Sequence, residues 1–344
     1  RGVPRNGYVL TCLTRAAALR GGVYRKNYKN GVIFMVSIKE IENFKDYGRC
    51  ICVTNGVIEA YVTVDIGPRI IRFGYVDGQN MMCSNRKAFG PKDDKEFTAY
   101  FGEGKHWENL GGHRIWLSPE SYPETYYPDL EPVSYEITDD GAVFTPNPEI
   151  ENGAAKSLEI KMDSDDANMQ VIMRVKNISE KDKNFAVWGL SVSEKGGTLI
   201  IPMNTNDTGL LSNRIVSVWP YTDMSNDRIY WGNKYVTLRQ DSKYNKPIKL
   251  GFDLNCGTVY YCLNDDIFCK SYDTNHPNGN YPDGGCSFET YTNDSMIEVE
   301  SLSELKTVKP GETVTHTESW ALCKRPCDID FKNDKSIDNM LEKL

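Results

Sequence analysis

The sequence predicts an all-β protein, a sandwich or barrel of many short strands followed by one short C-terminal helix. Apolar and polar residues alternate at every second position through most of the chain, with many β-branched and aromatic side chains. Gly, Asn, Asp and Pro interrupt this alternation about every 8–14 residues, as turns do in sandwiches and barrels.

The clearest strands are expected where the alternation is longest. Cys50–Val64 passes through Asn55-Gly56, a dipeptide that favours a tight hairpin turn, so a pair of strands is expected there. For the same reason, Asp77-Gly78 and Asp140-Gly141 are predicted to form hairpin turns. Further strands are expected at Met169–Val175, Tyr235–Leu238 and Met296–Leu302.

The C-terminus is the one place with strong helical periodicity. Residues 335–344 are predicted to form a surface helix with Ser336 or Asp334 as its N-cap. No repeat or low-complexity linker divides the sequence before this helix. We therefore expect one β domain over residues 35–325 and a helical tail over residues 326–344.

The formal net charge of −8 is unevenly distributed. Residues 1–34 carry seven basic side chains and no acidic one, and removing these seven charges leaves −15 for residues 35–344. An acidic domain repels polyanions, so nucleic acid and anionic membranes are not expected as partners. No apolar run reaches the ~18 residues that a membrane-spanning helix needs.

The basic leader, residues 1–34, has three interpretations. A signal peptide needs an uninterrupted apolar core, but Thr11, Thr14 and Arg15 interrupt the best stretch, so this is disfavoured. A targeting or nucleic-acid-binding arm would fit the charge, although no amphipathic period is clear. The favoured interpretation is that the native protein starts at Met35, because the first strand-like pattern follows it directly.

The cysteines and histidines indicate a cytoplasmic protein without a metal site. The ten Cys residues contain no C-x-x-C pair, and a large chain without an export signal is expected to keep reduced, mostly buried thiols. The four His residues lack the H-x-x-x-H and H-E-x-x-H spacings of zinc sites. No metal ligand is therefore predicted, and no feature of the sequence indicates an oligomeric state.

Three stretches break the alternation: residues 100–127, 211–231 and 275–292. Each combines Trp or Tyr with polar and charged side chains, a content more typical of binding loops than of plain strands. For any single Trp, packing inside a loop is the alternative interpretation. The recurrence of this content in three places favours one shared site.

These side chains suit a sugar. Aromatic faces stack on the C–H groups of a pyranose, and its hydroxyls need both donors and acceptors. Arginines supply planar donor forks, whereas carboxylates supply acceptors or general bases, and a carboxylate pair could also hydrolyse a glycoside. The residues expected to bind the sugar are Arg69, Trp107, Asn109, Arg114, Trp116, Glu120, Arg214, Trp219, Tyr221 and Asp283.

The order of six motifs between Asn55 and Leu322 resembles the galactose mutarotase-like (aldose 1-epimerase-like) superfamily, and most closely its DUF4380 family. The most specific motif is the last, in which a strand-borne Glu precedes a PGE turn and an H-T-E-x-W strand. The resemblance implies a β-supersandwich with the sugar on its concave face. The motifs are IGPRIIRFGYVDGQNMM (66–82), GGHRIWLSPE (111–120), FAVWGLSVSEKGG (185–197), LLSNRIVSVWPYTD (210–223), YPDGGCSFETYTN (281–293) and VESLSELKTVKPGETVTHTESWAL (299–322).

The resemblance also implies an isomerase chemistry that needs no metal or organic cofactor. In mutarotases a Glu takes a proton from the anomeric hydroxyl while a His protonates the ring oxygen. Glu300 stands where the family carries its base, ten residues before the PGE turn, and Glu298 has the same strand parity. Glu289 is the rival for this role. His113 in GGHRIW matches the first of the two family histidines.

The second family histidine is missing, because Trp188 stands at its place in FAVWGLS. Either His113 is the acid, or Arg114 and a Tyr replace it, or the protein does not catalyse mutarotation. Three functions therefore stay open: a cofactor-free aldose mutarotase or epimerase, a non-catalytic domain that recognises a sugar or oligosaccharide, and a glycoside hydrolase or lyase.

Overall fold

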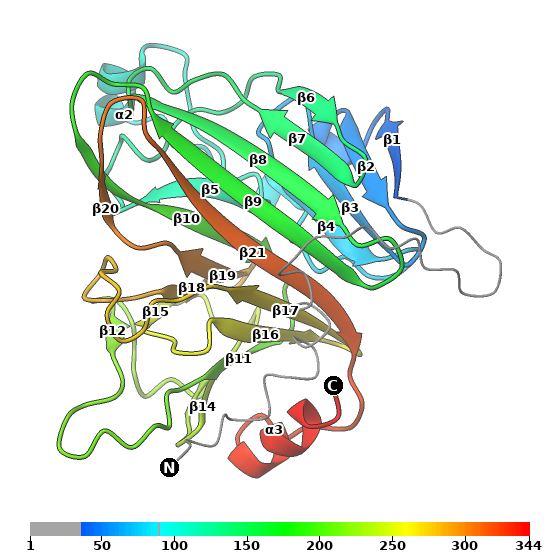
Figure 1. Ribbon diagram of the computed structural model, residues 1–344, viewed down its shortest axis with the longest axis vertical. Coiled ribbons are helices and arrows are strands. Elements are labelled where there is room, and N and C mark those ends of the chain that lie inside the picture. The colour runs from blue at the N-terminus through cyan, green and yellow to red at the C-terminus, as the bar shows by residue number, and fades with distance from the viewer. Residues whose placement is uncertain (1–35, 89) are drawn as a thin grey trace.

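The computed structural model describes residues 36–88 and 90–344, and the predicted basic leader lies outside these described residues. Two large antiparallel sheets pack face to face, with the apolar core between them (Figure 1). The prediction of an all-β protein with a short C-terminal helix is confirmed, and the paired sheets form a supersandwich.

The first sheet contains 11 strands within the described residues. Ten of these strands pair in one continuous order, and β20 (Lys306–Val308) pairs with β10 outside this order. In this order the strands are β1 (Ser37–Ile41), β2 (Cys50–Thr54), β3 (Ile58–Thr63), β4 (Ile70–Tyr75), β5 (Gly112–Ser118), β10 (Lys183–Ser193), β19 (Ile297–Leu302), β18 (Phe288–Thr292), β15 (Ile248–Phe252) and β12 (Val216–Val218).

The second sheet contains 10 strands in the same described part of the chain. Its long strand β21 crosses the molecule diagonally and joins the two halves of the sheet (Figure 1). In order across the sheet the strands are β13 (Ile229–Trp231), β14 (Tyr235–Arg239), β11 (Thr198–Pro202), β16 (Thr258–Leu263), β17 (Asp266–Tyr272), β21 (Thr313–Lys324), β9 (Asn168–Asn177), β8 (Ala154–Met162), β7 (Gly141–Thr145) and β6 (Ser134–Ile137).

The four strand segments predicted from alternation are all strands of these sheets. Asn55-Gly56 connects β2 to β3 and Asp140-Gly141 lies between β6 and β7, as predicted for hairpins. Asp77-Gly78 is a turn after β4, but the chain that follows forms no paired hairpin strand. Instead the Asn80 side chain bonds the backbone there, accepting from the N–H groups of Phe73 and Met82.

The core between the sheets is mainly apolar. Phe73 of β4 packs edge-to-face against Phe268 of β17 and Trp320 of β21, with ring centroids 5.5 and 5.1 Å away. These three fully buried rings tie the first sheet to the second, because aromatic pairs gain from this geometry beyond their buried area.

Polar contacts also cross this core. Lys270 of β17 is fully buried, and its Nζ lies 2.9 Å from a carboxylate oxygen of Glu318 on β21. The same ammonium donates to the backbone carbonyls of Gly189 at 3.2 Å and Val299 at 2.8 Å, which belong to the first sheet. Lys270 therefore links the two sheets through strands β10 and β19.

Short helices complete the fold. The C-terminal helix α3 (Asp334–Leu341) buries Ile337, Met340 and Leu341 against the second sheet. The predicted caps are wrong, since the side chain of Asn333 accepts from two N–H groups of the first turn. The other helices are η3 (Lys45–Tyr47), η4 (Arg86–Ala88) and α2 (Lys95–Phe101), and no helix of the described residues is long and apolar enough to cross a membrane.

Candidate functional site

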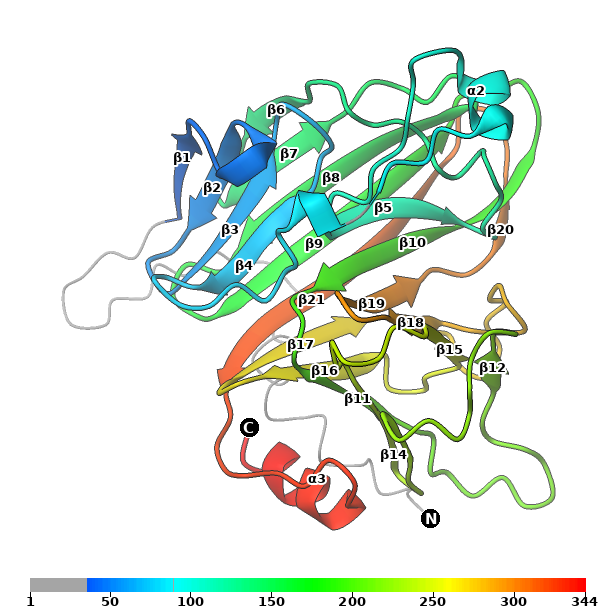
Figure 2. The same cartoon turned by 180° about the vertical axis from the view of Figure 1, so that it is seen from behind.

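A cavity of about 610 Å³ lies on the face of the first sheet that points away from the core. Pockets of ~300–1,000 Å³ are typical of small-molecule sites. Residues of strands β5, β10, β19, β18 and β15 line its floor. These strands are neighbours in the sheet (Figure 2). The loops that precede and follow β5, together with the segment after β12, complete its wall.

Strand alternation decides which side chains reach the cavity. On β5, Arg114 and Trp116 line the cavity, whereas Ile115 and Leu117 belong to the core between the sheets. The same alternation places Trp188 and Leu190 of β10 at the cavity. Successive residues of a strand point to opposite faces, so each of these strands contributes to the core and to the cavity at once.

A row of three tryptophans forms the apolar wall. Trp188 and Trp116 are register partners on β10 and β5, with ring centroids 5.6 Å apart and planes 23° apart. Trp107, from the loop before β5, stacks on the other side of Trp116 at 5.8 Å and 12°. Tyr126 packs edge-on against Trp107 and Trp116, at 5.0 Å from each. Each ring of the wall therefore packs against the next.

Arg114 lies on this wall. Its guanidinium is 4.3 Å from the ring centroid of Trp116, and its Nη1 donates to the side-chain oxygen of Asn109 at 3.4 Å. The nearest carboxylate is that of Glu298, at 3.9 Å. The residue lines the cavity and is only 4% exposed. A planar fork of donors above an aromatic face can bind oxygen-rich ligands.

Lys249 of β15 lies on the cavity floor between two buried carboxylates. Its Nζ is 3.0 and 2.8 Å from the two oxygens of Glu300 and 2.8 Å from one oxygen of Glu289. Burial lowers the pKa of Lys249, but the charges of Glu300 and Glu289 outweigh this effect and raise it above its ordinary value. The ammonium also lies 4.7 Å from the ring centroid of Trp188.

Glu298 is the carboxyl group of β19 that lines the cavity itself. It is 7% exposed, and its carboxyl group has no hydrogen-bond partner among the described residues. Burial, reinforced by the negative charge of Glu300, raises the pKa of Glu298 to about 8, although Arg114 and Lys249 partly oppose this. In the same way, burial raises the pKa of Glu289 to about 8 against the opposing effect of Lys249.

The structure brings seven of the ten predicted sugar-binding residues to one cavity. Two of the three unusual stretches supply them, and the third supplies Tyr291 of β18. Parts of these stretches are strands rather than loops, since β5 and β18 run through them. The seven residues are Trp107, Asn109, Arg114, Trp116, Glu120, Trp219 and Tyr221.

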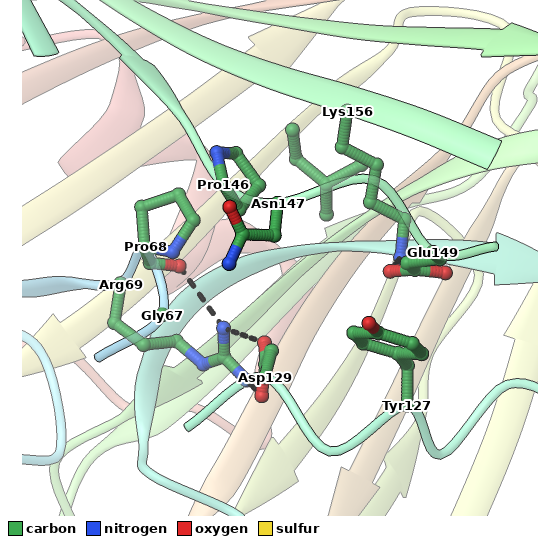
Figure 3. A pocket seen from close by; sticks show the side chains of 10 residues that line it. Gly67, Pro68, Arg69, Tyr127, Asp129, Pro146, Asn147, Glu149 and Lys156 are labelled. Atoms are coloured by element: carbon green, nitrogen blue, oxygen red, sulfur yellow. Dashed lines mark hydrogen bonds and ion pairs between the residues drawn. The ribbon is translucent and has the colours of Figure 1, made fainter. Parts of the chain in front are cut away.

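The other three predicted binding residues lie elsewhere. Arg69 is buried beside a separate pocket of about 30 Å³, where its guanidinium pairs with Asp129 at 2.6 Å (Figure 3). Arg214 donates to the backbone carbonyls of Asn204 and Asn233 and thereby holds a loop. Asp283 is a turn residue whose carbonyl accepts from Ser217.

The predicted acid and base lie on opposite faces of the sheet. Glu300 contacts Lys249 on the cavity side, as does Glu289. The imidazole of His113 is fully buried in the core, where its Nδ1 lies 2.9 Å from Ser191 Oγ and its ring packs edge-on against Trp320. Burial and the positive charge of Lys270 lower the pKa of His113 well below its ordinary value.

Some cavity residues were not predicted from the sequence. In the sequence, Trp188 is only a departure from a family pattern. The signal for Lys249 is its position as a lone Lys in the strand sequence IKLGF. The sequence indicates only that Glu298 lies on the same face of its strand as Glu300. The remaining cavity residues that sequence reasoning missed are Gly90, Lys92, Tyr126, Leu190, Tyr291 and Met296.

Solved structures share this fold at low sequence identity. A galactose mutarotase-like protein from Clostridium acetobutylicum matches with a TM-score of 0.50 at 12% identity, over 84% of this chain and 99% of that one. YeaD of Salmonella typhimurium, a candidate mutarotase, matches with a TM-score of 0.52 at 8% identity, over 91% of this chain and 100% of that one. The chain therefore has a galactose mutarotase-like fold.

The same fold also occurs as part of a longer protein. A TPR-domain-containing protein from Parabacteroides distasonis matches with a TM-score of 0.54 at 13% identity, over 81% of this chain. The match covers 48% of that protein, so the present chain spans about half its length. No protein-family model matches the chain, and no curated protein matches it in sequence.

Proposed function

We propose that the protein recognises a carbohydrate in the cavity of the first sheet. The observation that carries this proposal is the row of Trp107, Trp116 and Trp188 beside the donors of Arg114 and Asn109. Stacked indoles offer faces for the C–H groups of a sugar, and the polar groups next to them match its hydroxyls. The mutarotase-like fold is in keeping with this ligand class. The finer assignment to the DUF4380 family and the cytoplasmic location stay predictions.

Recognition without turnover is favoured over the acid–base mechanism that the sequence suggested. A mutarotase needs an acid and a base on either side of one C1–O5 bond. Glu300 and His113 do not meet this requirement, because strand β5 directs His113 into the core. In addition, Glu300 is held by Lys249 through both of its oxygens.

An aldose 1-epimerase, an isomerase without metal or organic cofactor, is the second candidate. The specific observation in its favour is that the carboxyl group of Glu298 lines the cavity with a raised pKa. A carboxyl that holds its proton near neutral pH can act as a general acid, so Glu298 could take the role that a histidine has in mutarotases.

Two NMR measurements on one sugar panel test both candidates. Saturation-transfer difference spectra with D-glucose, D-galactose and their β-linked disaccharides report binding, and magnetisation exchange between anomers reports mutarotation. Binding without faster anomer exchange supports recognition alone. Faster exchange that is lost in Glu298→Gln supports the epimerase. No saturation transfer to any sugar of the panel would contradict the proposed function.

A further inference from the structure

The cavity floor contains more acids than bases. Glu289, Glu298 and Glu300 are each at most 7% exposed, and the buried cations beside them are Lys249 and Arg114. If all five groups were ionised, the buried cluster would hold one uncompensated negative charge. An unpaired buried charge is expensive, and a carboxyl in such a position keeps its proton instead. Charge counting alone therefore requires at least one protonated carboxyl in this cluster.

Geometry distinguishes the three carboxyls. Glu289 and Glu300 each have an oxygen 2.8 Å from Lys249 Nζ, a distance that stabilises the ionised form of both. Glu298 is separated from its nearest cation, Arg114, by 3.9 Å, which is too long for a hydrogen bond. Glu298 is therefore the carboxyl of the cluster that has no cation within hydrogen-bond distance, whereas Glu289 and Glu300 share Lys249.

The other groups around Glu298 do not change this result. Those nearest on the rim are Glu120, which adds negative charge, and the phenols of Tyr126 and Tyr291, whose pKa values are raised by burial. None of these supplies a further positive charge to Glu298. The titratable and charged groups that face it are Arg114 of β5, Lys249 of β15, Tyr291 of β18, Glu300 of β19, and Glu120 and Tyr126 of the loop after β5.

We infer that Glu298 is a neutral carboxylic acid that donates its proton in a hydrogen bond to an oxygen of the carbohydrate in the cavity. The inference rests on the proposed function for the identity of the ligand. A carboxylate can only accept, whereas a carboxylic acid also donates. The ring and glycosidic oxygens of a sugar can only accept, so a carboxylic acid complements them and a carboxylate does not. The raised pKa of Glu298 agrees with this assignment.

The protonation state is tested on the free protein. The full chain is labelled with [5-13C]glutamate, and the carboxyl resonances are followed through a pH titration. We expect the resonance that is missing from Glu298→Gln to be that of a protonated carboxyl at neutral pH and to titrate near pH 8. If the resonance missing from Glu298→Gln is already ionised at pH 6, the inference is wrong. This measurement needs no sugar, so it can contradict the inference without contradicting the proposed function.

The donor role is tested by calorimetry with whichever panel sugar binds best. Wild-type affinity should fall about tenfold per pH unit above the titration of Glu298, because one proton is needed for binding. Glu298→Gln keeps an N–H donor but cannot ionise, so it should bind at neutral pH without this pH dependence. Glu298→Ala should bind weakly at every pH. Equal pH dependence in wild type and Glu298→Gln would overturn the donor role.

Discussion

His113 and Arg114 are adjacent in β5, yet their side chains lie on opposite faces of the sheet. The imidazole packs against Trp320 between the two sheets, and the guanidinium covers Trp116 in the cavity. This arrangement follows from strand alternation. It separates two residues that the sequence motif GGHRIW presents as one functional unit.

The separation predicts different consequences for the two positions. Arg114→Met should weaken sugar binding about tenfold or more, since a hydrogen bond to a charged donor contributes roughly 1.5–3 kcal/mol. His113→Ala should leave the Kd of the folded protein unchanged within error and lower its unfolding free energy by about 2 kcal/mol, since it empties a packed core position. Calorimetric titration would measure the Kd of both variants, and chemical denaturation would measure their unfolding free energies. Loss of binding in His113→Ala at full stability would contradict it.

A second prediction concerns the loop wall of the cavity. Trp219 lines the cavity and is only partly buried, so Trp219→Ala should lower sugar affinity without unfolding the protein. The expected loss is about 2–10-fold, because an aromatic contact contributes roughly 0.5–1.5 kcal/mol beyond buried area. Trp231→Ala is the matched control, since Trp231 is 40% exposed and lies outside the cavity lining. Equal losses in both variants would argue against a specific contact.

A third prediction concerns Lys249. Lys249→Met leaves Glu289 and Glu300 buried without their shared cation and should cost about 3–5 kcal/mol of unfolding free energy. The loss should shrink in acid, where both carboxyls can be protonated in the variant. Lys234→Met is the control, because the half-exposed pair of Lys234 and Asp338 should contribute at most ~1 kcal/mol. Urea denaturation at pH 4 and pH 8 would measure both effects.

A fourth prediction concerns the pH dependence of stability. The folded-state pKa values of Glu289 and Glu298 are about 8, above the ordinary 4.5, so the folded protein binds protons more tightly at these sites than the unfolded chain. The stability they contribute is fully present below about pH 4.5 and is lost as pH rises through about 8. Each group changes the unfolding free energy by at most ~1.4 kcal/mol per pH unit within this window.

Thermal melts between pH 5 and pH 9 would test the sign of this effect. The wild-type protein should melt at lower temperature as pH rises. The double variant Glu289→Gln/Glu298→Gln should show a flatter profile, because neither position can ionise. A profile that is equally steep in the double variant would assign the effect to other groups.

The fold class and much of the cavity could be predicted because both are local properties of the sequence. Alternation along each strand predicts the sheets, and the dense mixture of aromatic and polar residues marks Trp107, Arg114 and Trp116 before any tertiary contact is known. The motif does not say which strand parity faces the cavity. A shift of one residue exchanges the two faces, so the motif alone does not separate His113 from the site.

Lys249 could not be predicted because its role depends on long-range strand pairing. It stands 51 residues from Glu300 in the sequence, and only the pairing of β15, β18 and β19 brings the two together. The ion-pair partners of an isolated Lys in an apolar strand can be identified only once its cross-strand neighbours are known. The N-cap of α3 was missed for a simpler reason: the helix begins one residue earlier than its periodicity suggested, which makes Asn333 the cap.

The ammonium of Lys270 contacts carbonyls of β10 and β19 at Gly189 and Val299, directly behind the cavity residues Trp188 and Glu298. The same short backbone segments of β10 and β19 therefore carry cavity residues on one face and contact Lys270 on the other. A ligand that reduces local opening of β10 and β19 should slow amide hydrogen exchange in β17, on the far side of the core, although the ligand does not contact β17. Exchange measured by mass spectrometry would then report ligand binding from the opposite sheet.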